Sequence, residues 1–115
     1  MAKWTRDELI LTLDLYISSG HRVVEKSRPE TIALTALLNS IRAADLEVPK
    51  GEVRTPGSVK AKLANFRALD PTTDSTGWGN GAKLDRDVWD EFADNPDALA
   101  HQVSLIRSSL NRIPS

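Results

Sequence analysis

Hydrophobic positions recur every three or four residues along most of the chain, which is the spacing of residues on one face of an α-helix. The stripe near the C-terminus shows this spacing most clearly; it consists of Leu99, Val103, Ile106 and Leu110. Between residues 6 and 19 the apolar positions cover most sides of a helix, which indicates a central helix with several neighbours. No segment shows a clear strand pattern, so the sequence predicts an all-α fold.

Capping signals divide the first half of this pattern into two helices. Thr5 and Glu8 form a capping box at the start of the first helix, which should end at Gly20. Pro29 suits the first turn of the second helix, and Thr35 is a candidate for restarting that helix after a kink. Residues 43–52 should form the connecting loop.

Three further start signals follow in the second half of the chain. Thr55 precedes a proline and should cap the third helix, with Ser58 as an alternative cap. Asp85 should cap a short fourth helix, and Asn95 should cap the last one. The chain is therefore predicted to be a compact domain of about five helices, with a long glycine-rich loop between the third and the fourth.

The composition fits a single domain that spans residues 1–115. Hydrophobic residues make up 40% of the chain and charged residues 27%, which is ordinary for a globular fold. The absence of cysteine excludes disulfides and cysteine-based metal sites. No apolar run approaches the roughly 20 residues that cross a bilayer, and the N-terminus turns acidic too soon for a signal peptide. We therefore expect no membrane partner and a cytoplasmic location.

Charge is distributed unevenly along a chain whose net charge is only −1. Residues 50–67 carry five cationic side chains and one acid, whereas residues 84–100 carry six acids and one arginine. One interpretation is a domain with a basic and an acidic side that docks on nucleic acid in a fixed orientation. The other is that solvated helix faces differ in sign, and charge alone leaves both interpretations open.

Nothing in the sequence supports catalysis. The two histidines, His21 and His101, are 80 positions apart and lack the spacing of metal ligands. No glycine-rich phosphate loop follows a strand, and no serine has a base in a recognisable arrangement. We expect a binding module without catalytic residues, metal or other cofactor.

The predicted third helix and the residues before it are the first candidate binding site. The cationic side chains, the cap threonine and one amide in this segment are Arg54, Thr55, Lys60, Lys62, Asn65 and Arg67. Cations concentrated on one helix of a nearly neutral chain indicate an anionic partner, and helix N-termini favour anions. Asn side chains bond adenine edges or phosphates, although Asn65 equally suits bracing the following loop.

The same helix has an apolar stripe on one side and small residues on the other. The stripe consists of Val59, Leu63 and Phe66, and the small residues opposite it are Ala61, Ala64 and Ala68. The stripe should face the core. The alanines either let the backbone of a partner come close or pack against a second helix.

The glycine-rich loop is the second candidate binding site. In this loop Trp78 lies between two glycines, and Asn80 comes directly after the second of them. Lys83 lies three positions after Asn80. Glycines let the backbone approach a ligand closely. One interpretation is that the tryptophan contacts a base, by stacking on it or by covering a pyrimidine methyl group. The other is that it folds back on the core of the domain.

With these residues in view, the chain resembles the N-terminal domain of McrA-type HNH restriction endonucleases, which depend on modified cytosine. The matching blocks are Trp4–Tyr16 (WTRDELILTLDLY), Arg54–Val59 (RTPGSV), Lys62–Pro71 (KLANFRALDP) and Gly81–Phe92 (GAKLDRDVWDEF). The resemblance implies a DNA-reading domain placed ahead of a separate nuclease domain. It implies double-stranded DNA with 5-methylcytosine or 5-hydroxymethylcytosine as the target, contacted in the major groove with the modified bases left in the stack.

The chain departs from that family because it lacks a nuclease module. We therefore expect a reader and no enzyme, either excised or stand-alone, with an HNH nuclease domain as the implied partner in a full-length protein. The rival interpretation is a helical protein-interaction module that works through the acidic surface of residues 84–100.

Overall fold

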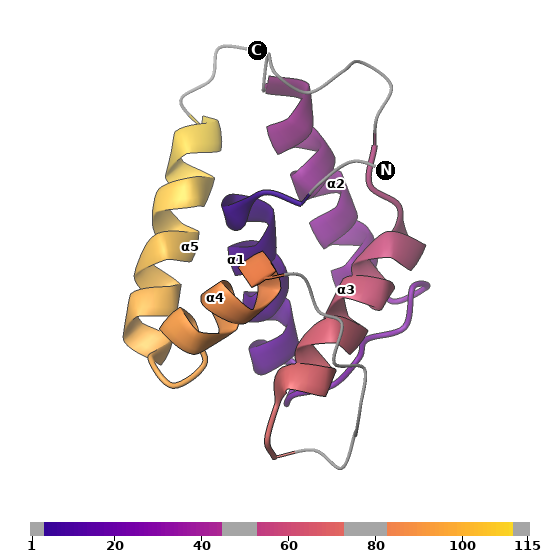
Figure 1. Ribbon diagram of the computed structural model, residues 1–115. Coiled ribbons are helices and arrows are strands. Elements are labelled where there is room, and N and C mark those ends of the chain that lie inside the picture. The colour runs from indigo at the N-terminus through magenta and orange to yellow at the C-terminus, as the bar shows by residue number, and fades with distance from the viewer. Residues whose placement is uncertain (1–3, 45–52, 73–82, 112–115) are drawn as a thin grey trace.

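The chain folds into five helices within residues 4–44, 53–72 and 83–111, which are the residues that the computed structural model describes (Figure 1). In chain order the helices are α1 (Arg6–Ser18), α2 (Pro29–Ala44), α3 (Pro56–Leu69), α4 (Lys83–Phe92) and α5 (Pro96–Asn111). No strand occurs in the described ranges, which confirms the predicted all-α fold.

α1 lies at the centre of the bundle, with the other four helices arranged around it (Figure 1). The side chains of Leu9, Leu13 and Tyr16 are 0% exposed. They can all be buried because α1 is apolar on most sides and meets a neighbour in each direction. The prediction of a central helix over residues 6–19 is confirmed.

Both ends of α1 lie where the capping signals predict them. The Thr5 hydroxyl accepts a hydrogen bond from the Glu8 amide at 3.3 Å, and the Glu8 carboxylate accepts one from the Thr5 amide at 3.0 Å. At the other end the chain leaves the helix through Gly20, whose φ of +80° lies in the left-handed region that glycine tolerates best. His21 follows with a φ of +60°, so two successive left-handed residues turn the chain away from α1.

α2 is continuous from Pro29 to Ala44, so the predicted restart at Thr35 is wrong. The Thr35 hydroxyl donates to the Thr31 carbonyl at 2.7 Å inside the helix, so it does not interrupt the backbone ladder. The helix also includes positions 43 and 44, which were expected in the connecting loop. The rest of that loop lies outside the described residues.

α3 begins as predicted, with Thr55 as its cap. The Thr55 hydroxyl accepts from the Ser58 amide at 3.1 Å, and the Ser58 hydroxyl accepts from the Thr55 amide at 2.9 Å. Ser58 therefore completes a capping box and does not replace Thr55 as the cap. Asn95 caps α5 as predicted, because its side-chain oxygen accepts from the Ala98 amide at 3.4 Å.

The predicted role of Asp85 as the cap of α4 is wrong. α4 begins at Lys83, so Asp85 lies inside the first turn, where it is only 1% exposed. Its carboxylate accepts hydrogen bonds from the ammonium of Lys62 on α3 at 3.0 and 3.1 Å. A cation on a neighbouring helix determines where this carboxylate lies, and the local sequence carries no sign of it.

The core includes the region where α1, α3 and α4 meet. Val59, Leu63 and Phe66 of α3 are each 0% exposed, and the Phe66 ring stacks on Trp89 of α4 with 6.3 Å between centroids. The apolar stripe predicted for α3 is therefore confirmed. Within the described residues, no helix is long and apolar enough to cross a membrane.

We expect Leu63→Ala and Phe66→Ala each to lower the free energy of unfolding by about 2–5 kcal/mol, because each leaves a cavity in a packed core. Thermal and urea unfolding followed by circular dichroism measure this loss. Ala64→Ser, on the exposed side of the same helix, is the matched control and should cost about 0.5 kcal/mol. Unchanged melting temperatures for both core variants would show that the buried face of α3 is misassigned.

Candidate nucleic-acid interface

α3 turns a face of small side chains outward. Gly57, Ala61 and Ala64 are exposed, and Ala68 is half-buried. These residues lie on the side of α3 opposite its buried stripe. The exposure of Ala61 and Ala64 contradicts the expectation that a second helix packs on them, because no described helix does, and the close approach of a partner stays a prediction.

Two cations border this small face on one side. The Lys60 side chain is 39% exposed and pairs with Glu25 at 2.9 Å. Arg67 is also exposed, and it lies on the same side of the helix because residues seven apart fall almost in line. We call Lys60, Ala61, Ala64 and Arg67 the α3 face.

The loop between α1 and α2, residues 19–28, runs beside α3 (Figure 1). Glu25 of the loop pairs with Lys60, and His21 Nδ1 lies 2.6 Å from the Asp70 carboxylate just after α3. The loop carries three exposed cations, which are Arg22, Lys26 and Arg28. The structure therefore brings a second group of cations to the helix that the sequence singles out.

These three loop cations were not predicted as part of a site. Their signal in the sequence is three basic residues within positions 22–28, but Glu25 and Glu30 in the same region obscure it. Glu30 lies 3.7 Å from Arg28, an exposed pair of little energetic weight. The contact of Glu25 with Lys60 places the loop beside α3, whereas Arg22 and Arg28 line a hollow that the loop forms with the end of α1.

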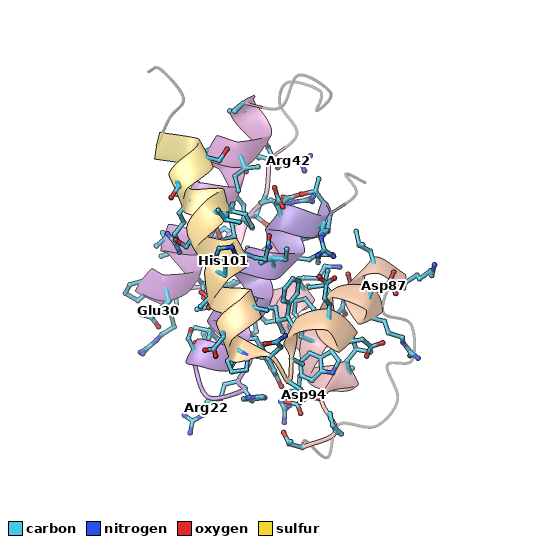
Figure 2. All side chains as sticks on the ribbon, turned by 90° about the vertical axis from the view of Figure 1, so that its left-hand side faces the viewer. Arg22, Glu30, Arg42, Asp87, Asp94 and His101 are labelled. Carbon is cyan, nitrogen blue, oxygen red and sulfur yellow. The ribbon has the colours of Figure 1, made fainter. Side chains whose placement is uncertain are left out.

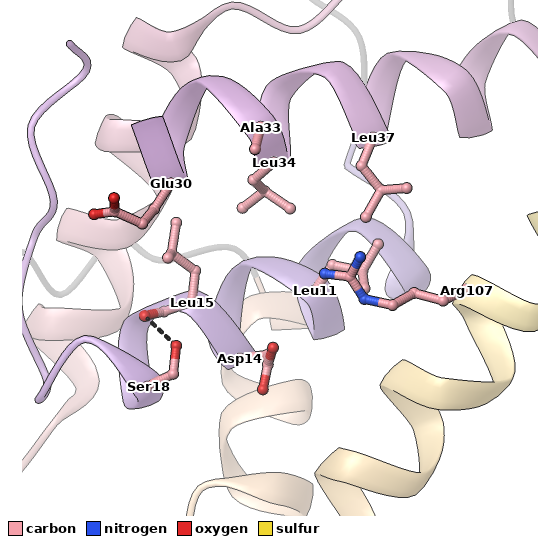
Figure 3. A pocket seen from close by; sticks show the side chains of 9 residues that line it. All are labelled: Leu11, Asp14, Leu15, Ser18, Glu30, Ala33, Leu34, Leu37 and Arg107. Carbon is pink, nitrogen blue, oxygen red and sulfur yellow. Dashed lines mark hydrogen bonds between the residues drawn. The ribbon is translucent and has the colours of Figure 1, made fainter. Parts of the chain in front are cut away.

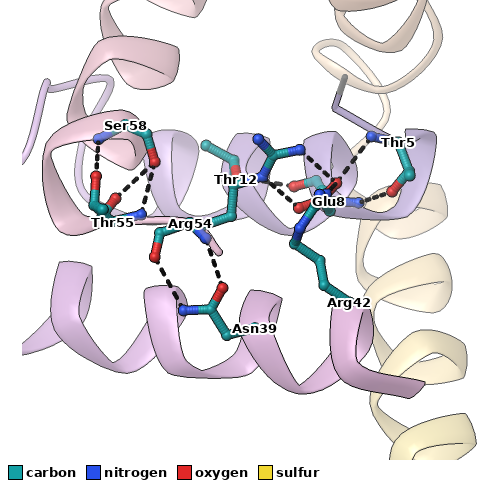
Figure 4. A network of polar contacts seen from close by, with 8 residues as sticks. All are labelled: Thr5, Glu8, Thr12, Asn39, Arg42, Arg54, Thr55 and Ser58. Carbon is teal, nitrogen blue, oxygen red and sulfur yellow. Dashed lines mark hydrogen bonds and ion pairs between the residues drawn. The ribbon is translucent and has the colours of Figure 1, made fainter. Parts of the chain in front are cut away.

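The predicted contact of Arg54 with phosphate or guanine requires a surface position, but Arg54 does not lie at the surface. It is 6% exposed, and its guanidinium binds both carboxylate oxygens of Glu8, with Nε at 2.7 Å and Nη2 at 3.0 Å (Figure 4). The ring of Trp4 lies 4.3 Å from the same guanidinium. A buried carboxylate needs a cation beside it, so the expected surface position of Arg54 is wrong and its side chain holds the start of α3 in place.

Glu8 is 0% exposed and is the centre of this network (Figure 4). Its Oε1 also accepts from Arg42 Nη1 on α2 at 3.2 Å and from the Thr5 amide. Burial raises the pKa of Glu8, but the hydrogen bonds from Arg54 and the Thr5 amide outweigh burial and hold the pKa below its ordinary value. The Asn39 amide bonds the Arg54 backbone in both directions, at 2.6 and 3.0 Å. The network therefore joins α1, α2 and the start of α3.

Lys62 and Asn65 turn toward α4. Lys62 is 8% exposed and binds Asp85, and the Asn65 amide donates to the same carboxylate at 3.3 Å. The expectation that Lys62 is a surface cation is therefore wrong, because the buried Asp85 holds its charge. Asn65 is half-buried and braces α4, so its contact with Asp85 has a structural role, although the partner is a helix and not the following loop that was expected.

Asp70 is a third carboxylate buried beside α3, at 3% exposed. It accepts from the Tyr16 hydroxyl at 2.8 Å and from the amide and hydroxyl of Thr72 at 2.8 and 2.7 Å, besides its contact with His21. Burial raises the pKa of Asp70, but the hydrogen bonds from Thr72, His21 and Tyr16 outweigh it and lower the pKa to about 2. For Tyr16, burial and the bond to Asp70 raise the pKa. Asp70 thereby fixes the α1–α2 loop against the end of α3.

The remaining predicted site residues fall into two groups. Thr55 is exposed as the cap of α3, and Lys83 is exposed as the first residue of α4. Trp78 and Asn80 lie outside the described residues. Contacts of all four with DNA stay predictions.

The acidic surface predicted over residues 84–100 is exposed apart from Asp85. Its exposed acids are Asp87, Asp90, Glu91, Asp94 and Asp97. Figure 2 shows Asp87 and Asp94 on the α4 side of the bundle, opposite Glu30 of α2. Glu91 pairs with Arg6 at 2.6 Å, and no group of acids and histidines in the described part of the chain could hold a metal ion.

No family model, curated protein or solved structure matches this chain significantly. The likeness to modified-cytosine readers therefore stays a prediction, and function has to be inferred from the geometry of the site.

We expect Asp70→Asn to weaken the dependence of stability on acid. Because the folded-state pKa of Asp70 is about 2, below the ordinary 3.8, its contribution to stability is complete above pH 4 and is lost as the pH falls toward 2. Between pH 5 and pH 2, the free energy of unfolding of the parent should therefore fall by about 2 kcal/mol more than that of Asp70→Asn. Urea unfolding at several pH values measures the difference, and Asp87→Asn, an exposed carboxylate, should keep the parent's profile. Parallel profiles for the parent and Asp70→Asn would contradict the assignment.

Proposed function

We propose that this chain binds double-stranded DNA through the α3 face and the adjoining α1–α2 loop. The observation that carries the proposal is the exposed row of small residues on α3, bordered by Lys60 and Arg67, with the cationic α1–α2 loop joined to Lys60 through Glu25. Small side chains let a helix backbone approach a phosphate chain closely. Cations along one edge of such a face contact the phosphates of the adjacent strand.

The distribution of charge supports a fixed orientation on DNA. Most of the exposed acids lie on α4, in the turn after it and at the start of α5, whereas the cations of the proposed surface come from α3 and the α1–α2 loop, with Glu25 and Glu30 as the exposed acids beside them. A nearly neutral domain with this division is attracted to DNA by one side and repelled on the other. The net charge of −1 is therefore compatible with DNA binding.

We further propose that the DNA carries 5-methylcytosine or 5-hydroxymethylcytosine, read in the major groove without base flipping. This finer proposal is supported by the resemblance of the sequence to the reader domains of HNH restriction endonucleases. It makes the chain the targeting domain of such an enzyme, with the HNH nuclease domain as its partner. Because burying one methyl group is worth about 0.8 kcal/mol, strong selectivity needs two modified bases per site or a tight apolar pocket.

The roles of the predicted site residues divide accordingly. Lys60 and Arg67 contact phosphates, whereas Arg54 and Lys62 hold α3 in position from inside the fold. Trp78 and Asn80 are the proposed base contacts, since the loop that carries them leads into α4 at Lys83.

Lys60→Ala and Arg67→Ala should weaken binding to all duplexes to a similar degree, because phosphate contacts carry no sequence information. Each variant should also reduce the slope of log Kd against log salt concentration by about 1. Fluorescence anisotropy over a salt series measures both quantities. Arg86→Ala, an exposed arginine of the acidic α4, is the matched control and should bind like the parent.

Two outcomes of the same series would overturn DNA binding by this surface. One is parental affinity and salt slope in both variants. The other is an affinity that hardly responds to salt, which is typical of an apolar protein interface and favours a protein partner for the exposed acids of α4 and α5.

Trp78→Ala tests the finer proposal. It should reduce the preference for modified over unmodified duplexes more than it reduces affinity for unmodified DNA, because an aromatic ring suits a base better than a phosphate. Matched unmodified, methylated and hydroxymethylated duplexes in a competition assay measure the preference. A large fall in melting temperature with the preference intact would place Trp78 in the core.

A further inference from the structure

A cleft of about 280 Å³ with a mixed polar and apolar lining lies between α1, α2 and α5, and side chains of all three helices form its walls (Figure 3). Its apolar lining consists of Leu11, Leu15, Ala33, Leu34 and Leu37. The α3 face takes no part in the cleft. The cleft and the surface proposed for DNA therefore share no residue.

Asp14 is the feature of the cleft that the fold does not explain. Its carboxylate points from α1 toward the space beside α5, at the edge of the cleft, and the residue is half-buried (Figure 3). Within the described residues it makes no hydrogen bond and no ion pair within 4 Å, unlike Glu8, Asp70 and Asp85. Burial raises the pKa of Asp14 above its ordinary value, with Arg107 opposing the rise. A desolvated carboxylate without a partner is unfavourable unless something cationic meets it.

The other polar groups of the cleft are exposed or already bonded. Glu30 is exposed at the rim and lies 3.7 Å from Arg28. The Ser18 hydroxyl donates to the Leu15 carbonyl at 3.2 Å. Arg107 is an exposed side chain that extends from α5 toward Leu11 and supplies the cation of the cleft lining (Figure 3).

We propose that this cleft binds a small organic ammonium ion, with the ammonium group on the Asp14 carboxylate and a branched apolar body against the leucines of α1 and α2. The volume lies just below the range of about 300–1,000 Å³ that is usual for ligand pockets, which favours a small body. Burial of the ligand's apolar body against the aliphatic lining contributes to the binding free energy, and the Asp14 carboxylate makes the cleft prefer a cationic ligand over an uncharged one. Arg107 competes with the ligand for Asp14 and must move aside when the ligand binds.

The test compares two probes of the same shape, 3-methylbutylammonium and the uncharged 3-methylbutanol. Titrations are followed by the methyl NMR signals of Leu11, Leu15, Leu34 and Leu37 in the intact chain. The ammonium probe should shift these signals saturably. The expected Kd is in the millimolar range, which corresponds to a binding free energy of about −4 kcal/mol. It should bind at least about tenfold more tightly than the alcohol.

Three variants decide the assignment. Asp14→Asn should abolish the advantage of the ammonium over the alcohol, while its melting temperature stays near the parent's. Asp87→Asn, the same change on the far side of the bundle, should keep the advantage. Arg107→Ala should tighten binding of the ammonium several-fold, because it removes the competing cation. Equal binding of the two probes, an advantage that survives Asp14→Asn, or weaker ammonium binding by Arg107→Ala would each overturn the proposal.

Discussion

The buried carboxylate of Glu8 is the constraint on which the rest of the structure depends. It lies in the first turn of the central helix, is fully removed from water, and is held by Arg54 ahead of α3 and Arg42 on α2. Removing one partner from such a group leaves an uncompensated charge in the interior, which costs about 3–5 kcal/mol. The packing of α2 and α3 on α1 therefore has to satisfy this carboxylate as well as bury the apolar stripes.

Two further buried acids extend the same principle along α3. Asp85 on α4 takes the ammonium of Lys62 in the middle of the helix, and Asp70 holds the loop before α2 against the end of the helix. α3 is therefore fixed by carboxylates at its start, middle and end. Cations on its inner sides belong to the fold, and those on its outer side, Lys60 and Arg67, define the surface proposed for DNA.

This division also explains how Asp14 differs from the other acids of the interior. Each fully buried carboxylate beside α3 has hydrogen-bond donors from another part of the chain, as the pKa directions of Glu8 and Asp70 reflect. Asp14 is half-buried on the opposite side of α1 and faces an open cleft instead. Two surfaces on opposite sides of one central helix thus offer different chemistry, a cationic one proposed for phosphates and a cleft that combines aliphatic side chains with the Asp14 carboxylate.

The sequence by itself determined the five helices, the caps of α1, α3 and α5 and the stripe that α3 buries, because helix periodicity and capping depend on residues three or four positions apart. It also located the helix around which the candidate site is built. Only the tertiary structure decided which cations of that helix face outward: Arg54 and Lys62 are buried because acids 46 and 23 positions away lie beside them. The loop cations join the site for the same reason, since the contacts of Glu25 and His21 with α3 and the turn that follows it span 35 and 49 positions. Pairing over such distances depends on how the helices pack, and no local pattern in the sequence encodes it.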